Sequence, residues 1–457
     1  RKMLWLMLLL VYYCGSAGGL KDEGNPLFEF AYRRTYLEKL DQCFCELTGR
    51  VEDCCCDVET VDSLNRLVVY PLVTSLVAEP YFRFYRVNLN RQCPFWPDDS
   101  RCHLKDCHVQ YCTEGEIPDF LKLETEFTSG QEKNSCIELD ENKLSAVNIS
   151  ISSEQNERFK DWEQYDTTES YCVIDDENSS YVDLRINPER FTGYIGGSPQ
   201  RIWNAIYQEN CFKPAGTLPA KLSFLDASSL QGLCLEKRVF YRLVSGLHAS
   251  INIHLSAQYA VPGANGHVYF EPNLSQFVRR FDVATTRGQG PNWLKNLYFT
   301  YLVVLRALTK AGTYWDSQSF YTGDTGRDIL VKEKIMTIVN AAKTCNSLFD
   351  ETQMFLGTSQ DLKHEFREHF RNISRIMDCV GCNKCRLWGK LQVHGIGTAL
   401  KMLFSEQAIT TPLTLSRNEI VALVNVLGRL SGSIHSLGTF RNMLAEQGKP
   451  LARADEL

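Results

Sequence analysis

Apolar side chains recur every three or four residues along several stretches of the C-terminal half of the chain. Such a recurrence places one apolar stripe along a helix and predicts that this stripe faces a core. One series predicts a helix over residues 240–255, and another predicts a helix over residues 362–377. The clearest series comprises Leu294, Leu297, Tyr298, Tyr301, Leu302, Leu305 and Leu308.

Two shorter helical patterns follow, around residues 398–405 and 418–430. Because glycine disfavours helix interiors, Gly395 and Gly397 are expected to separate the first of these from the helix before it. We find no convincing alternating series of the kind that predicts strands. The expected fold class is therefore mainly α.

The first part of the chain has a different character. Residues 41–136 are rich in cysteine and turns and poor in long helical periodicity, so we expect an irregular lobe that disulfides hold together. Residues 137–180 are polar and predict a solvated loop. The helical core is then expected over residues 181–445.

Composition points to an oxidising compartment. The 457 residues include 18 cysteines, which a reducing cytosol seldom tolerates. The formal net charge is −6 and no long basic run exists, which argues against a nucleic-acid partner.

Both ends of the chain carry targeting patterns. Arg1 and Lys2 precede an apolar stretch that is short for a bilayer span, so residues 1–17 predict a signal peptide, with a short membrane anchor as the alternative. An N-terminal extension follows over residues 18–40. The tail at 446–457 ends in Ala-Asp-Glu-Leu, which is similar to the retrieval signal Lys-Asp-Glu-Leu. Together these patterns predict the lumen of the endoplasmic reticulum, with at most peripheral membrane association.

Four Asn-X-Ser sequences, at Asn148, Asn178, Asn273 and Asn372, are compatible with N-glycosylation. We predict glycans at Asn273 and Asn372.

The sharpest chemical signal is the sequence Cys379-Val-Gly-Cys382-Asn-Lys-Cys385. A zinc or iron–sulfur site would suit the spacing, but it needs a further cysteine nearby, and an oxidising lumen favours disulfides, so we predict no metal. A purely structural disulfide is a second alternative. We favour a redox-active pair of Cys382 and Cys385 near a helix start, where Lys384 and the following basic residues would lower a thiol pKa.

A dithiol alone only exchanges electrons with another dithiol, so a net oxidase needs a cofactor that passes them to oxygen. No Gly-x-Gly-x-x-Gly pattern supports a Rossmann site. Aromatic and cationic residues suited to a flavin occur in residues 187–204 and 245–252. Taken alone, His248 on an apolar helix is usually explained as a core residue, and Trp203 more often packs in a core than stacks on a ligand.

A second cysteine group contains Cys102 and Cys107. The simplest interpretation is a set of static disulfides in a loop. A pair in a flexible loop could instead carry electrons between an external partner and a buried dithiol.

These residues resemble the endoplasmic reticulum oxidoreductins, a family of flavin thiol oxidases that recharge protein disulfide isomerase. The resemblance covers about residues 43–430. The matching motifs are Cys43-Phe-Cys45, Cys56-Asp-Val-Glu-Thr60, Cys93-Pro-Phe-Trp96, residues 187–194, Ser245-Gly-Leu-His248-Ala-Ser-Ile-Asn252 and Asn372-Ile-Ser-Arg-Ile-Met-Asp-Cys379-Val-Gly-Cys382.

The resemblance implies a single, mainly helical domain that holds FAD in a helical core. Cys382 and Cys385 would form the inner disulfide beside the flavin, and Cys102 and Cys107 the outer shuttle pair that meets the isomerase. Electrons would pass from the isomerase through both pairs to FAD and then to molecular oxygen, giving hydrogen peroxide. The residues that match the family's flavin contacts are Arg190, Thr192, Tyr194, Trp203, Ser245, His248 and Arg280.

The same resemblance implies further disulfides. Structural pairs would tie Cys93 to Cys379 and Cys211 to Cys234. Regulatory pairs would join Cys102 to Cys136 and Cys107 to Cys112. Two local disulfides would form among Cys43, Cys45, Cys54 and Cys56.

The chain departs from the family pattern at several positions. Cys55, Cys172 and Cys345 have no implied partner, and Trp293 stands where the family usually has a basic residue near the FAD diphosphate. We therefore expect weaker flavin retention. The competing function class is a non-catalytic, cysteine-rich lumenal scaffold that binds isomerases.

Overall fold

The structure is a computed structural model that describes residues 58–96, 101–102, 107–122, 170–173, 178–189, 194–195, 198–212, 227–263, 267–345, 349–355, 360–405 and 413–448. Within these residues the chain is mainly helical, which confirms the expected fold class. The expected signal peptide, the N-terminal extension and residues 449–457 of the retrieval-like tail lie outside the described residues.

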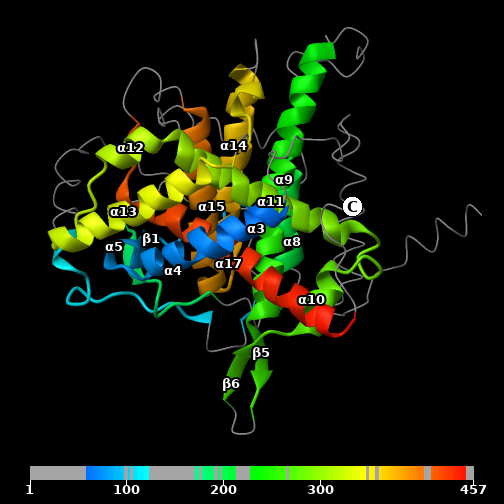
Figure 1. The fold of residues 1–457 in the computed structure, drawn as a ribbon, viewed down its shortest axis with the longest axis horizontal. Helices are drawn as coiled ribbons and strands as arrows, with labels where there is room; N and C mark the ends of the chain where they lie inside the picture. The colour runs from blue at the N-terminus through cyan, green and yellow to red at the C-terminus, as the bar shows by residue number, and fades with distance from the viewer. Residues whose placement is uncertain are drawn as a thin grey trace, which may run out of the picture.

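Four long helices form the centre of the molecule (Figure 1): α9 (Ala227–Ala257), α11 (Gln289–Lys310), α15 (Asn383–Phe404) and α17 (Arg417–Glu446). The apolar periodicities predicted α9 and α11 correctly. Among the described helices, α17 alone is long and apolar enough to cross a membrane, but 72% of its apolar window is buried inside the protein. It is therefore well explained as the core helix of a globular fold.

Helices α9 and α11 approach each other closely at Gly246. A Cβ atom at this position would lie 2.1 Å from Thr300 Oγ1 and 2.3 Å from the carbonyl oxygen of Asn296. Only a residue without a side chain fits there, so Gly246 sets the distance between the two helices.

The expectation that Gly395 and Gly397 interrupt a helix is wrong, because α15 runs through both. A Cβ atom at Gly395 would lie 2.4 Å from the carbonyl oxygen of Ala422, and one at Gly397 would lie 2.4 Å from Cys172 Sγ. The two glycines allow α15 to pack closely against its neighbours, and tertiary packing outweighs their low helix propensity.

The prediction of a loop-like lobe over residues 41–136 is wrong for residues 58–83. These residues form α3 (Val58–Leu64), the π-helical turn η1 (Asn65–Val69), α4 (Tyr70–Ala78) and α5 (Pro80–Arg83). Val69 and Val73 are fully buried in the core. The wide turn of η1 shifts the register of the apolar positions, which hides the helical period in the sequence.

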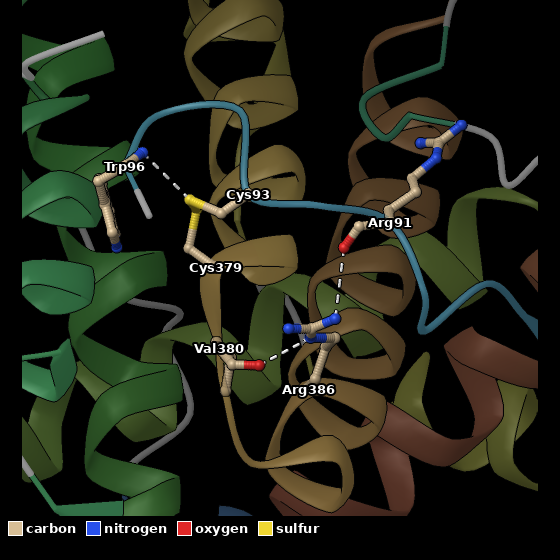
Figure 2. The surroundings of a disulfide bond; sticks show 6 residues. All are labelled: Arg91, Cys93, Trp96, Cys379, Val380 and Arg386. Carbon is tan, nitrogen blue, oxygen red and sulfur yellow. Dashed lines mark hydrogen bonds between the residues drawn. A yellow bond between two sulfur atoms is a disulfide. The ribbon is translucent and has the colours of Figure 1, made fainter. Parts of the chain in front are cut away.

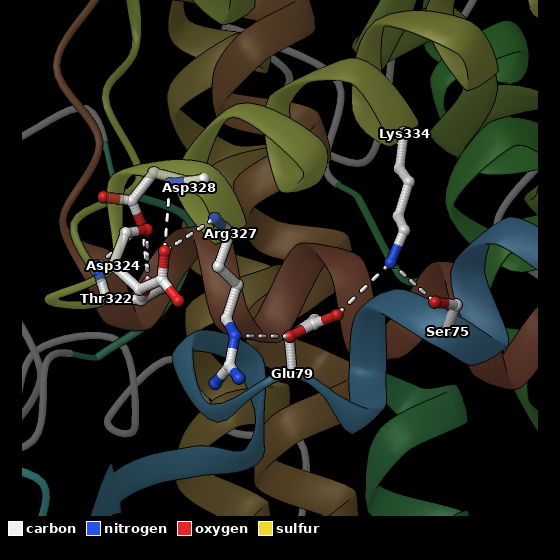
Figure 3. Close-up of polar contacts among 8 residues, drawn as sticks. Ser75, Glu79, Thr322, Asp324, Arg327, Asp328 and Lys334 are labelled. Carbon is white, nitrogen blue, oxygen red and sulfur yellow. Dashed lines mark hydrogen bonds and ion pairs between the residues drawn. The ribbon is translucent and has the colours of Figure 1, made fainter.

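Helix α13 (Thr325–Ala342) covers α4 on one side and follows the short helix α12 (Gly312–Ser317). Glu79 accepts from Lys334 at 3.2 Å and lies 3.9 Å from Arg327 (Figure 3). Asp324 caps the first turn of α13 by accepting from the backbone of Gly326 and Arg327. These polar contacts fasten the outer helix to the N-terminal helices.

The other described elements are shorter than the four central helices. The helices are α8 (Ser198–Gln208), α10 (Leu274–Phe281), η5 (Glu351–Gln353), α14 (Gln360–Ile376) and η6 (Met377–Cys379). The strands are β1 (Phe84–Val87), β2 (Arg101–Cys102), β3 (Ser180–Asp183), β4 (Tyr194–Ile195), β5 (Tyr259–Pro262) and β6 (Val268–Glu271). The strands form three antiparallel pairs, β1 with β3, β2 with β4 and β5 with β6, and the last pair projects as a hairpin from the end of α9 (Figure 1).

We predict that Gly246→Ala lowers the free energy of unfolding by about 1–3 kcal/mol, because the added methyl group forces α9 away from α11. Chemical denaturation of the purified protein measures this change. Gly438→Ala in α17 is the matched control, since nothing lies within 4 Å of its added Cβ atom. The control should be neutral or stabilising, and equal destabilisation of both variants would contradict the close contact.

Candidate functional site

Cys382 and Cys385 form a disulfide at the start of α15, with their Cα atoms 5.1 Å apart. Cys382 caps the helix, because its sulfur accepts a hydrogen bond from the backbone N–H of Cys385 at 3.3 Å. A helix N-terminus stabilises negative charge, so it favours a thiolate on Cys382 once the disulfide is reduced. The expected position of this pair at a helix start is confirmed.

The segment before Cys382 is held from both sides (Figure 2). A second disulfide joins Cys93 to Cys379, with Cα atoms 4.4 Å apart, in agreement with the pairing that the family resemblance implied. The guanidinium of Arg386 donates to the carbonyl oxygen of Val380 at 2.7 Å and to that of Leu89 at 2.6 Å. The residues around Cys93 and those before the inner disulfide are therefore tied together covalently and by hydrogen bonds.

Lys390 makes a second connection between these segments. Its ammonium group lies 2.8 Å from Asp378 Oδ1 and donates to the carbonyl oxygen of Asn88 at 2.9 Å. Lys390 was expected to lower a thiol pKa, but its charge is directed at this carboxylate and carbonyl. We interpret Lys390 as an anchor for the chain before the inner disulfide.

A cavity of about 330 Å³ adjoins the inner disulfide and lies between α8, α9, α14 and α15. This volume falls in the range of small-molecule sites in proteins. The walls are mostly apolar and include Trp203, Leu247 and Phe370. Cys385 and Gln392 also line the cavity, so the inner disulfide borders it.

The aromatic residues predicted for a flavin lie together beside the cavity. The ring of Trp203 stacks on that of His248, with centroids 3.6 Å apart and planes 8° apart. The hydroxyl group of Tyr207 is hydrogen-bonded to His248 Nδ1 at 2.9 Å, which fixes the imidazole ring. Trp203 thus forms a flat wall of the cavity, with His248 behind it.

Ser245 is fully buried and lies one helical turn before His248. Its Oγ accepts a hydrogen bond from Asn296 Nδ2 at 3.0 Å, and Asn296 Oδ1 accepts from Arg242 at 3.0 Å. This chain of contacts fixes the position of the hydroxyl group. Trp293, at the position where the resemblance implied a basic residue, is buried within α11.

Of the predicted flavin contacts whose side chains are described, only Trp203 lines the cavity. Arg190 and Thr192 lie outside the described residues, and only the backbone of Tyr194 is described, in β4. Arg280 lies on α10, where it donates to Gln276 Oε1 at 2.9 Å, and it does not line the cavity.

The backbone of one outer cysteine is paired with one of these segments. The backbone of Cys102, in β2, pairs with that of Tyr194 in β4. Cys107 is buried and belongs to a disulfide, whereas Cys112 is a thiol, so the regulatory pair of Cys107 with Cys112 is not formed in this structure. Cys136 lies outside the described residues.

One of the implied structural pairs is wrong for this structure. Cys211 carries a thiol, whereas Cys234 and Cys345 each belong to a disulfide. A disulfide forms only between cysteines whose Cα atoms lie about 4.4–6.8 Å apart, a condition that motif matching does not test. Cys172 is a buried thiol that donates to the carbonyl oxygen of Val393 at 3.4 Å. The implied local disulfides of Cys43, Cys45, Cys54 and Cys56 lie outside the described residues, as does Cys55.

The two predicted glycosylation sites have different surroundings. Asn273 caps α10 through Oδ1, which accepts from the backbone of Gln276 at 3.0 Å, so a glycan on its nitrogen would leave the cap intact. Asn372 uses its nitrogen to donate to Glu209 Oε2 at 3.1 Å. Glycosylation at both positions stays a prediction.

Sequence reasoning missed a buried polar group at the cavity. Gln392 Nε2 donates to Glu189 Oε1 at 2.7 Å, and Glu189 Oε2 lies 2.6 Å from Arg429 Nε. Glu189 belongs to the 187–194 stretch that the sequence patterns did single out. A polar glutamine within an otherwise apolar helix face was the one further signal for Gln392.

A helical bundle that holds a Cys-x-x-Cys disulfide at a helix start, against an apolar cavity, defines a thiol oxidoreductase that acts with a bound organic cofactor or substrate. Comparison with known proteins identifies the family of thiol oxidoreductases to which the chain belongs. The family profile of Endoplasmic Reticulum Oxidoreductin 1 (ERO1) matches residues 68–437. The chain belongs to this family.

Individual relatives agree with this assignment. The chain is 44% identical over 476 residues to the Ero1-like protein of Drosophila melanogaster, covering 96% of each chain. It is 45% identical over 433 residues to the ERO1-like protein alpha of Homo sapiens, covering 88% of this chain and 92% of the relative. A solved structure of Ero1p, described as a source of disulfide bonds for oxidative protein folding in the cell, is 32% identical, with a TM-score of 0.56, over 85% of this chain and 99% of the other.

The protein is therefore a thiol oxidase of the endoplasmic reticulum that generates disulfides for oxidative protein folding. Membership of this family disfavours the alternative of a non-catalytic scaffold.

We predict that the double substitution Cys93→Ala with Cys379→Ala lowers the free energy of unfolding by about 2–5 kcal/mol, because it removes a link across 286 residues. Denaturant titration under non-reducing conditions measures the loss. Cys112→Ala removes a thiol that belongs to no disulfide and should change stability far less. A double variant as stable as the wild type would show that Arg386 and Lys390 anchor the segment alone.

Cys112 should react with electrophiles unusually slowly at neutral pH. Burial raises the pKa of its thiol to about 11, and the carboxylates of Asp183 and Glu116 add to the increase. Only the thiolate reacts, so the alkylation rate by iodoacetamide should rise about tenfold per pH unit from pH 7 to pH 10, below the raised pKa. Mass spectrometry of the Cys112 peptide measures the rate, with glutathione as an internal control that levels off near its pKa of about 8.5. A plateau of the Cys112 rate at the same pH would contradict the prediction.

Proposed function

We propose that the protein is an FAD-dependent thiol oxidase of the endoplasmic reticulum lumen. It takes electrons from reduced thioredoxin-fold proteins of the protein disulfide isomerase type and passes them to molecular oxygen. The electrons travel through an outer pair, Cys102 with Cys107, and then an inner pair, Cys382 with Cys385. The observation that carries the proposal is that Cys385 lines an apolar cavity suited to a planar ring.

The residues around the cavity fit a flavin. An isoalloxazine ring is flat and largely apolar, with a few polar atoms along one edge, and the cavity offers the flat wall of Trp203, apolar side chains and the amide of Gln392. The Oε1 atom of Gln392 is buried and has no hydrogen-bond partner, which is uncommon unless a ligand supplies one. Ser245 and His248 are buried on α9 and do not line the cavity, and His248 supports this wall by stacking on Trp203. When bound here, FAD would accept two electrons from the inner dithiol and deliver them to oxygen, which becomes hydrogen peroxide.

The burial of Cys382 supports a relay through two pairs, and Cys385 is partly buried beside it. Cys382 is only 1% exposed, so a folded substrate protein cannot bring a thiolate to its sulfur. The backbone of Cys102 is joined through β2 and β4 to the segment that leads into α8, which carries Trp203. This backbone link supports the proposal that the outer pair is the carrier.

Each exchange step conserves atoms and electrons. A thiolate of the reduced isomerase attacks the outer disulfide, and its second thiol completes the transfer, so the isomerase is oxidised and the outer pair is reduced. The outer dithiol then attacks the inner disulfide, whose S–S bond breaks as a new one forms between Cys102 and Cys107. The N-terminus of α15 stabilises the thiolate that this step leaves on Cys382. The overall reaction converts two thiols and oxygen into one disulfide and hydrogen peroxide.

We predict that Cys382→Ser retains the flavin absorbance of the purified full-length protein but consumes oxygen at the rate of the enzyme-free background. The reason is that the variant has no inner disulfide to accept electrons. An oxygen electrode, with reduced protein disulfide isomerase as the donor, measures the rate.

Cys172→Ser is the matched control, because Cys172 is a buried thiol against α15 that is not part of the relay. It should keep most of the activity. A colourless wild-type protein would overturn the assignment of FAD, and full activity in Cys382→Ser would overturn the relay.

A further inference from the structure

Helix α15 contributes four residues to the cavity wall, and three of them form one stripe beside Val393. Cys385, Gly389 and Gln392 follow one another at intervals of four and three residues, so they lie on one helix face. Gly389 has no side chain to fill the space between the other two, and a Cβ atom there would lie 2.8 Å from Met377 Sδ. Along this face, a disulfide cysteine, a position without a side chain and an amide group therefore follow one another.

The orientation of the Gln392 amide is fixed by its surroundings. Its Nε2 donates to Glu189 Oε1 at 2.7 Å, and the other oxygen of Glu189 lies 2.6 Å from Arg429 Nε. A carboxylate paired with a guanidinium can only accept hydrogen bonds, so the amide nitrogen must face Glu189. The amide oxygen consequently points away from Glu189.

This amide oxygen has no hydrogen-bond partner, although Gln392 is only 2% exposed. A buried acceptor that is left unsatisfied lowers stability, and such atoms are rare in folded proteins. Since Gln392 lines the cavity, a ligand in the cavity is the natural source of the missing donor.

We propose that Gln392 Oε1 accepts a hydrogen bond from the ring N–H of the bound flavin and so fixes the orientation of the ring beside Cys385. This inference rests on the proposed function. An oxidised isoalloxazine carries a single N–H group, at N3, so the acceptor selects one edge of the ring. Glu189 and Arg429 hold the amide in the orientation that makes this selection.

The test uses the full-length protein, stripped of flavin and titrated with either FAD or N3-methyl-FAD, with quenching of flavin fluorescence as the readout. The wild-type protein should bind FAD roughly tenfold more tightly than the methylated analogue, because methylation removes one hydrogen bond in a buried site. Gln392→Leu should bind FAD about as weakly as the wild type binds the analogue, and it should lose most of the preference between the two.

Thr398→Val is the matched control on the same helix. Its hydroxyl group is buried and donates to the carbonyl oxygen of His394, and it does not line the cavity. This variant should keep the wild-type preference for FAD. The comparison of the two flavins on the wild-type protein needs no substitution, so it remains decisive if the Gln392 variant does not fold.

The outcomes separate the two proposals. Equal affinity of the wild-type protein for both flavins, or an unchanged preference in Gln392→Leu, would overturn the role of Gln392 and leave the oxidase function standing. A wild-type protein that binds neither flavin would overturn the proposed cofactor and this inference with it.

Discussion

The structure depends on one constraint, the fixed position of the short segment that leads from Cys379 to Cys382. The Cys93 disulfide holds its first residue covalently, and Arg386 holds Val380 through its carbonyl oxygen. If Arg386 were absent, the carbonyl oxygen of Val380 would lose this hydrogen-bond donor, which would lower the free energy of unfolding. The position of the inner disulfide, and with it that of Cys385 at the cavity, is therefore set jointly by residues near position 90 and by α15.

Buried charges close to the site are paired. Lys390 lies against Asp378, and Arg429 lies against Glu189, with all four side chains less than 10% exposed. A buried charge without a partner would be expensive, whereas a hydrogen-bonded pair remains tolerable and fixes the geometry of its neighbours. Pairing leaves the cavity walls apolar, and in such surroundings a single polar contact, such as that of Gln392, carries more weight than it would in water.

The sequence predicted those features that depend on local periodicity and spacing. Helix α11 follows from its apolar stripe, and the inner pair follows from three cysteines at intervals of three. Features decided by tertiary packing were missed: Gly395 lies inside a helix because a neighbouring backbone approaches it, and the π-helical turn at 65–69 hides the period of the N-terminal helices. The orientation of Gln392 depends on Glu189, about 200 residues earlier in the chain, and no local pattern reveals such a contact.

Burial controls which sulfurs can exchange. Cys382 is buried, so thiols of other proteins cannot reach its sulfur. Its position at a helix start stabilises its thiolate once the disulfide is reduced. The reactivity of Cys112 is low for the opposite reason, because burial raises the pKa of its thiol and keeps the thiol protonated. An oxidase that contains many cysteines must let electrons pass along one route only. Neither the number of cysteines nor their spacing distinguishes a reactive sulfur from an inert one. In this fold, the access of other thiols to each sulfur and the stability of its thiolate together select the route.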